Sequence, residues 1–174
     1  ELENLAKSGK IWVGEKYNSL IYNYNYPFNF PNLIPDSNFI LKYSLLATSP
    51  VSSNFILNLN GNTKTIEFPI LNPSYSGNLA LNKIDYFTLS NINNPVNLNI
   101  NYNHPASSSN GWLNYIEVNA FRKLQFSGNQ MSFRTTQGFG SGNIAEFNFS
   151  NSPNNISVLD VTNPLNARFV DLKS

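Results

Sequence analysis

Hydrophobic and polar residues alternate along several short segments of this chain. The strictest alternation covers residues 96–103, where Val, Leu, Ile and Tyr take every second position and Asn takes the others. Because the side chains of a β-strand point alternately to its two faces, this pattern predicts a strand with one buried and one solvated face. Residues 22–30 repeat the pattern with aromatic residues. Pro27 cannot donate a backbone hydrogen bond, so it predicts an edge strand or a strand broken at that position.

Further segments bring the number of predicted strands to about ten. Residues 39–47 form a nearly continuous apolar run, which predicts a strand buried on both faces. Asn60-Gly61 separates residues 55–59 from residues 65–68, and it predicts a tight hairpin because Asn and Gly tolerate a positive φ. The remaining predicted strands are residues 85–89, 112–126, 131–134, 145–149 and 156–161.

Signals for helices are scarce in this sequence. Only residues 1–7 and 76–84 could form short helical turns. Turn-forming residues recur roughly every 8–12 positions between the predicted strands, which is typical of sandwiches and barrels. The sequence therefore predicts an all-β fold: a two-sheet, jelly-roll-like β-sandwich in which residues 1–174 form a single domain.

Arg122 interrupts the apolar face of the longest predicted strand, residues 112–126. One interpretation is that the strand bends, bulges or leaves the core near Ala120. The other is a buried arginine that pairs with a carboxylate, from Glu117, Glu146 or Asp160.

Composition excludes several kinds of chemistry. The 174 residues include 32 Asn, one His and no Cys, with a net charge of +1. Without cysteine there is no disulfide, no thiolate nucleophile and no Cys-based zinc site. The Lys and Arg residues are few and scattered, whereas nucleic acid binding requires them in clusters. We therefore expect no cofactor and no nucleic acid partner. We assign no metal-binding residue, and a calcium site built from loop carbonyls and one Asp stays open as an alternative.

Catalytic residues are equally hard to find. His104, the only histidine, precedes Pro105 and a run of serines in a predicted loop, without the strand–turn–helix context of a nucleophilic serine. We therefore predict that this chain is not an enzyme, and a small hydrolase that uses His104 remains a rival hypothesis.

Aromatic residues offer a possible binding surface. Trp12, Trp112 and Tyr115 could stack against sugar rings, as in a carbohydrate-binding module. The alternative is that these rings fill the core between the two sheets. Both interpretations remain open from the sequence.

One stretch resembles a known family. Residues 110–124 read Asn-Gly-Trp-Leu-Asn-Tyr-Ile-Glu-Val-Asn-Ala-Phe-Arg-Lys-Leu. Together with residues 12–15, 28–33, 131–134 and 158–164, in that order, they resemble the type IX secretion sortases, which are gingipain-like cysteine peptidases (peptidase family C25) of Bacteroidetes. In that family, the last segment resembles the lead-in to the catalytic domain.

The resemblance implies a parent protein at the outer face of the outer membrane. Such a parent removes C-terminal sorting signals from secreted cargo, helps to attach the cargo to surface polysaccharide, and works with an outer-membrane barrel. Its catalytic Cys and His belong to a downstream domain, so no catalytic residue carries over to this chain. We therefore expect a non-catalytic fragment that supports the downstream catalytic domain or docks a partner, cargo or glycan. The alternative function is a carbohydrate-binding module of a surface or secreted protein.

Overall fold

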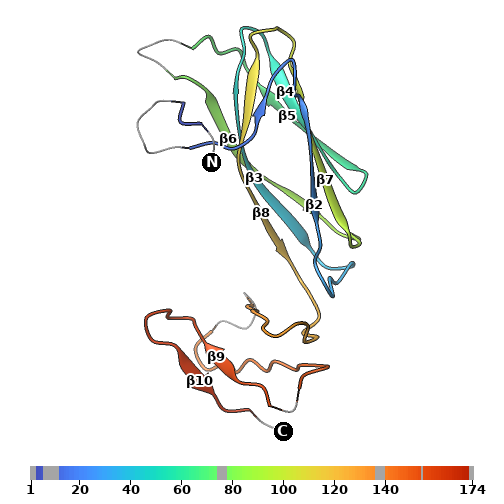
Figure 1. Cartoon of the computed structure of the whole chain (residues 1–174), viewed down its shortest axis with the longest axis vertical. Coiled ribbons are helices and arrows are strands. Elements are labelled where there is room, and N and C mark those ends of the chain that lie inside the picture. The colour runs from blue at the N-terminus through green and yellow to red at the C-terminus, as the bar shows by residue number, and fades with distance from the viewer. Residues whose placement is uncertain (1–2, 6–11, 74–77, 136–139, 154, 173–174) are drawn as a thin grey trace. The chain divides into compact units, whose positions relative to one another are not determined.

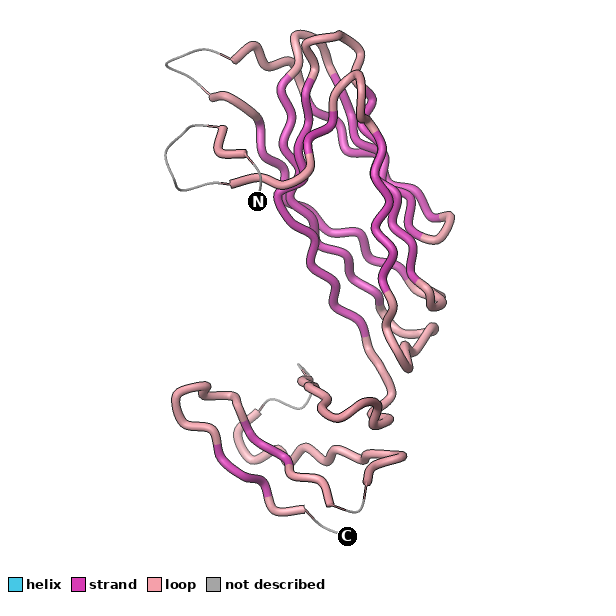
Figure 2. The backbone as a smooth tube through the Cα atoms, in the orientation of Figure 1, coloured by secondary structure: helices cyan, strands magenta, loops and turns pink. Residues whose placement is uncertain are grey.

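A computed structural model describes residues 3–5, 12–73, 78–135, 140–153 and 155–172 (Figures 1 and 2). The chain divides into two compact units, Glu1–Arg122 and Lys123–Ser174, where the sequence predicted one domain. The described residues contain ten strands and no helix, which confirms the all-β prediction. The helical turn expected at residues 76–84 is wrong from residue 81 onward, where a strand begins. The other predicted turn, residues 1–7, lies mostly outside the described residues.

The first unit contains eight strands in two antiparallel sheets. They are β1 (Lys16–Tyr17), β2 (Asn23–Phe28), β3 (Phe39–Thr48), β4 (Ser53–Leu59), β5 (Asn62–Phe68), β6 (Leu81–Leu89), β7 (Val96–Asn103) and β8 (Asn110–Ala120). The first sheet has the order β1-β8-β3-β6, and the second sheet has the order β2-β7-β4-β5.

The pairing follows a simple rule. β4 pairs with β5, β3 with β6, β2 with β7 and β1 with β8, as in one long hairpin folded at its tip. Successive pairs fall alternately in the two sheets, so the long hairpin wraps around the core as a jelly roll does. The predicted two-sheet, jelly-roll-like sandwich is thus confirmed.

The tip of that hairpin is the Asn60-Gly61 turn. Both residues have positive φ, 47° and 90°, as the prediction of a tight hairpin required. The edge position predicted from Pro27 is also observed, because β2 is the outermost strand of the second sheet.

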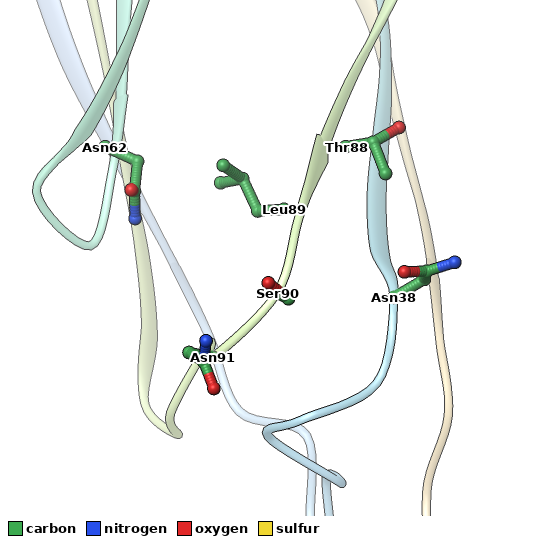
Figure 3. Close-up of a pocket in the computed structure, with 6 residues that line it drawn as sticks. All are labelled: Asn38, Asn62, Thr88, Leu89, Ser90 and Asn91. Carbon is green, nitrogen blue, oxygen red and sulfur yellow. The ribbon is translucent and has the colours of Figure 1, made fainter.

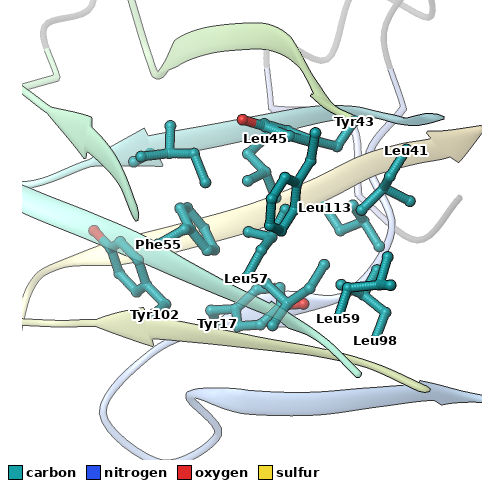
Figure 4. Packing of buried hydrophobic residues seen from close by; sticks show 14 of the residues in the cluster. Tyr17, Leu41, Tyr43, Leu45, Phe55, Leu57, Leu59, Leu98, Tyr102 and Leu113 are labelled. Atoms are coloured by element: carbon teal, nitrogen blue, oxygen red, sulfur yellow. The ribbon is translucent and has the colours of Figure 1, made fainter. Parts of the chain in front are cut away.

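The core lies between the inner faces of the two sheets (Figure 4). β7 alternates as predicted, and its four apolar side chains are almost completely buried. β3 alternates only as far as Tyr43 and is buried on both faces from there to Thr48. Its outer face is covered in this second half by a separate small cluster, in which Leu46 packs with Val13 and Trp112.

β8 is shorter than the sequence predicted. The strand ends at Ala120, and its bulge lies at Asn114, opposite the step from Ser44 to Leu45 in β3. The chain then leaves the sheet, and the Phe121 carbonyl accepts a hydrogen bond from Ile34 at 3.0 Å.

This early end of β8 agrees with the interpretation in which the strand leaves the core near Ala120. Arg122 forms an isolated backbone bridge with Leu33. Glu117, one of the proposed ion-pair partners of Arg122, forms an ion pair with Lys42 at 3.4 Å, and the Nε and Nη2 atoms of Arg122 are buried.

The second unit contains less regular secondary structure than the first. β9 (Val158–Asp160) and β10 (Arg168–Val170) form an antiparallel hairpin, with Leu159 opposite Phe169. The predicted strand at residues 156–161 is confirmed in part by β9. Residues 131–134 and 145–149 are not strands, so those predictions are wrong.

Residues 131–134 and 145–149 pack through aromatic rings and do not pair as strands. The ring of Phe133 lies 5.1 Å from that of Phe147 and 4.9 Å from that of Phe149. Isolated backbone hydrogen bonds join Ser150 to Leu124 and Phe126. The apolar residues of these two segments pack as a ring cluster. The sequence pattern alone does not distinguish such a cluster from the buried face of a strand.

Candidate functional site

His104 does not form part of a catalytic arrangement in the described structure. It lies in the loop after β7, and its ring centroid is 5.4 Å from that of Tyr22. The buried Ser109 hydroxyl is bonded to Ser49 at 2.8 Å. Among the described residues, His104 makes no hydrogen bond to a serine or a carboxylate. The hypothesis of a hydrolase that uses His104 therefore gains no support from the geometry.

The described residues also lack two features associated with metalloenzymes and membrane-spanning helices. In the described ranges, no three His, Cys, Asp or Glu side chains gather as a metal site would need. The same ranges contain no helix long and apolar enough to cross a bilayer.

A hollow of about 570 Å³ lies where β6 ends (Figure 3). Its lining consists of Asn38, Asn62, Thr88, Leu89, Ser90 and Asn91. These residues supply amide and hydroxyl groups but no titratable side chain. The hollow can therefore form hydrogen bonds with a ligand, but it contains no acid–base pair.

Trp112, one of the predicted binding residues, is buried against neighbouring side chains. It is only 4% exposed and packs with Val13 and Leu46. Its indole Nε1 donates to Glu3 Oε2 at 2.7 Å, and Lys16 Nζ lies 5.4 Å from the ring centroid. Because the ring is covered in this way, it is not available as a surface for stacking sugars.

Trp12 and Tyr115 are more accessible than Trp112. Trp12 is 44% exposed, and Tyr115 is half-buried on the outer face of the first sheet, where Lys42 Nζ lies 5.6 Å from its ring. The structure thus does not bring the three predicted residues together on one exposed platform. Binding by Trp12 and Tyr115 stays a prediction.

Sequence reasoning missed the neighbours of Tyr115 on this face. The β3 register places Lys42 opposite Tyr86 on one side and opposite Glu117 on the other. The Glu117 carboxylate raises the pKa of Lys42, and Tyr86 is 53% exposed. One feature of the sequence could have indicated this solvated face. Lys42 is the only charged residue in the apolar run of residues 39–47.

Lysines also close the open flank of the sandwich, where edge strands β5 and β6 face each other. Lys64 donates to Asp85 Oδ2 at 2.6 Å and to the Tyr86 carbonyl, and Lys83 donates to the Glu67 carbonyl. The hydrogen bond from Lys64 is the main reason that the pKa of Asp85 is lowered. Unpaired edge carbonyls are thus satisfied within the chain, and charged side chains on an edge discourage pairing with another strand.

An exposed apolar surface lies in the second unit, on the β9–β10 hairpin and its loop. We call it the hairpin patch; it consists of Leu159, Val161, Leu165 and Phe169. The cross-strand pair Leu159 and Phe169 is 50% and 76% exposed, and Leu165 at the tip is 96% exposed.

The loop of the hairpin patch is held by local hydrogen bonds. Asp160 Oδ1 accepts from the Thr162 amide at 2.9 Å, and Asn163 Oδ1 accepts from the Leu165 amide at 3.1 Å. Both are side-chain turns of the kind that Asp and Asn favour. The loop therefore presents Leu165 in a defined conformation.

Comparison with known proteins gives a likeness of fold. No protein-family model and no curated protein matches the sequence. The fold, however, is similar to part of a crystal structure of dimeric latent PorU from Porphyromonas gingivalis, with a TM-score of 0.81. The fold is PorU-like.

The extent of the match limits what it shows. The sequences are 19% identical, and the match covers 100% of this chain but only 17% of the PorU chain. At this identity the likeness establishes the fold alone. The match supports the fold expected from the resemblance to the type IX secretion sortases.

Proposed function

We propose that this chain is a non-catalytic accessory module of a type IX secretion sortase, a gingipain-like cysteine peptidase at the cell surface. The resemblance of residues 110–124 to that family supports the proposal, as does the PorU-like fold, since PorU is a common name for these sortases. The chain spans 17% of PorU, so a parent of that size has ample room for a separate catalytic domain. The absence of cysteine is consistent with a nucleophile located elsewhere in the parent.

The observation that carries the proposal is the hairpin patch. A two-stranded hairpin is marginally stable by itself, and β9 and β10 pair only with each other in the part of the chain that the structure describes. Its apolar pair Leu159 and Phe169 faces solvent, and exposed apolar patches of this kind mark sites of protein contact. The occupant that we propose is the downstream catalytic domain of the parent.

This arrangement assigns a structural role to the module. Apolar burial at the hairpin patch stabilises the contact, at roughly 25 cal/mol for each Å² removed from water. In this proposal the parent acts at the extracellular face of the outer membrane, where it meets an outer-membrane barrel and secreted cargo. The module orients the catalytic domain and contributes no reacting group.

A binding measurement with purified proteins tests the contact. Calorimetric titration of this chain into the separately produced remainder of the parent should show binding, because the hairpin patch loses its exposure to water on association. The double substitution Leu159→Ser/Phe169→Ser should weaken that binding at least tenfold.

A matched control comes from the first unit. Ile84→Ser/Tyr86→Ser removes two similarly exposed apolar side chains from the first sheet and should leave the affinity unchanged. Equal affinity of the wild-type chain and the Leu159/Phe169 variant would contradict the proposal.

A further inference from the structure

In the second sheet, the outer face of strands β2, β7 and β4 is built almost entirely from asparagine, whereas the outward positions of β5 are Thr63, Thr65 and Glu67. The outward positions of β2, β7 and β4 follow from the register of these strands and number ten. Eight of them are Asn: Asn23, Asn25, Asn54, Asn58, Asn97, Asn99, Asn101 and Asn103. The other two are Pro27 and Ile56. We call these eight residues the asparagine face.

The overall composition of the chain does not explain this face. The outward positions of β3, β6 and β8 in the first sheet hold three Asn, at residues 82, 110 and 119, and the bulge residue Asn114 adds a fourth amide, which donates to Ser44. Their other outward residues include Lys, Glu, Tyr, Trp and Ile. Both sheets come from the same Asn-rich chain, so the concentration of amides on one of them is a property of that face.

The asparagine face has a regular spacing and internal order. Alternate residues of a strand lie about 6.8 Å apart and neighbouring strands about 4.8 Å apart, so the amides form a lattice. Asn99 Nδ2, on the central strand β7, donates to Asn23 Oδ1 at 2.6 Å and to Asn25 Oδ1 at 2.8 Å. These bonds orient three side chains, and each amide offers two donors and an acceptor, so capacity remains for a ligand.

Electrostatics restricts the kind of ligand. None of the ten outward positions carries a charge, and on the neighbouring strand β5 an acidic residue, Glu67, lies opposite Asn54. Anionic polymers require Lys or Arg, and an apolar protein surface requires an apolar partner, which Ile56 alone does not provide. A neutral polyhydroxyl compound matches the face, because each hydroxyl group both donates and accepts hydrogen bonds as an amide does.

We propose that the asparagine face binds a neutral polysaccharide, which lies across β2, β7 and β4 with its hydroxyl groups bonded to the Asn amides. This surface lies in the first unit and differs from the aromatic residues Trp12, Trp112 and Tyr115. It is also independent of the hairpin patch, so each of the two proposals can fail without the other.

Affinity electrophoresis of the 174-residue chain tests the proposal. Native gels contain a soluble β-glucan, a mannan or a galactan, and parallel gels contain alginate or dextran sulfate. At least one neutral polysaccharide should retard the chain, and the two anionic ones should not. Asn99→Ala/Asn101→Ala should weaken the apparent affinity at least tenfold, because it removes the two central amides.

A second variant and a control keep the result clear. Asn101→Arg leaves the Asn99 hydrogen bonds in place and blocks the centre of the face, so it should have the same effect in a folded protein. Asn82→Ala/Asn119→Ala removes two amides from the first sheet and should retain full binding. The proposal is overturned if no neutral polysaccharide retards the chain, if the anionic ones do so instead, or if both asparagine-face variants bind normally. Loss of binding in the control, or in Trp12→Ala/Tyr115→Ala alone, also overturns it.

Discussion

At the scale of single residues, packing explains one position in the sequence segment that resembles the sortases. Gly111 on β8 faces the ring of Phe55, and a Cβ atom at residue 111 would lie 2.4 Å from Phe55 Cζ. The Phe55 ring is itself held by the rings of Tyr17, Phe68 and Tyr102, at centroid distances of 5.2, 5.8 and 4.5 Å. A side chain at residue 111 therefore has no space in the core.

Gly111→Ala should lower the free energy of unfolding by about 1–3 kcal/mol, the usual effect of overpacking a core. Urea denaturation of the wild-type chain and the variant measures this difference. In a Phe55→Leu background the same substitution should be better tolerated, because the opposing ring is gone. An identical loss in both backgrounds would show that contact with Phe55 is not the cause.

Two buried tyrosines should make the free energy of unfolding depend on pH in the alkaline range. The hydroxyl groups of Tyr17 and Tyr26 are 3.0 Å apart, and burial raises the pKa of Tyr26 to about 12 and also raises the pKa of Tyr17. In the unfolded chain these groups ionise near pH 10. Their contribution to stability is thus complete below about pH 10 and is lost as the pH rises from there through the folded-state pKa of Tyr26, near 12.

The free energy of unfolding should accordingly decrease between about pH 10 and pH 12. Chemical denaturation at a series of pH values measures the slope. Tyr17→Phe removes one ionisable hydroxyl group and should make the decrease shallower. A free energy that stays constant over this range, or a slope that Tyr17→Phe leaves unchanged, would contradict the account.

At the scale of elements, alternation, continuous apolar runs and turn residues together predicted most strands of the first unit. Alternation succeeded for β7 because that strand has one wet face and one buried face along its whole length. It missed β1 and β10, which are two and three residues long and thus too short to show a period. It wrongly predicted residues 131–134 and 145–149, because a strand also needs a partner, and sequence pattern does not reveal one.

The lysines on β5 and β6 lead to a prediction about association. Lys64→Ala/Lys83→Ala frees the edge carbonyls of Glu67 and Tyr86 and removes two charges from the flank of the sandwich. The stability loss should be small, within about 1 kcal/mol, since these lysine contacts are at the surface. The main effect should be self-association through the edge strands, measured by light scattering over a range of concentrations.

Lys42→Ala is the matched control for that variant. It breaks another lysine ion pair, with Glu117, in the interior of the first sheet rather than at an edge. It should remain in the oligomeric state of the wild-type chain. If the Lys64/Lys83 variant does the same, protection of the edges is not the role of these lysines.

At the scale of the whole molecule, the structure has two compact units, and the sequence pattern did not mark the boundary between them. The predicted strand at residues 112–126 runs across the boundary at Arg122, so the pattern gave no sign of a break. The hairpin patch was concealed for a related reason. Leu159 and Phe169 have the sequence character of core residues, and only the topology shows that no third strand covers them within the described structure.

The location of some asparagine residues on a solvated strand face could be predicted from the sequence. Their alternation over residues 96–103 predicted a wet strand face, which the structure confirms. The sequence did not show that β2 and β4 place their own asparagines beside β7, because that depends on the strand order. The surface that we propose for polysaccharide is therefore visible only in the folded chain.

We propose that this chain serves a surface peptidase by contact and not by chemistry. The most direct test introduces Leu159→Ser/Phe169→Ser into the chromosomal gene and measures the fraction of secreted cargo that retains its C-terminal sorting signal. The account predicts that uncleaved cargo accumulates while the level of the parent protein stays normal. Cargo cleaved as completely as in the wild type, with the variant protein stable and at the cell surface, would contradict it.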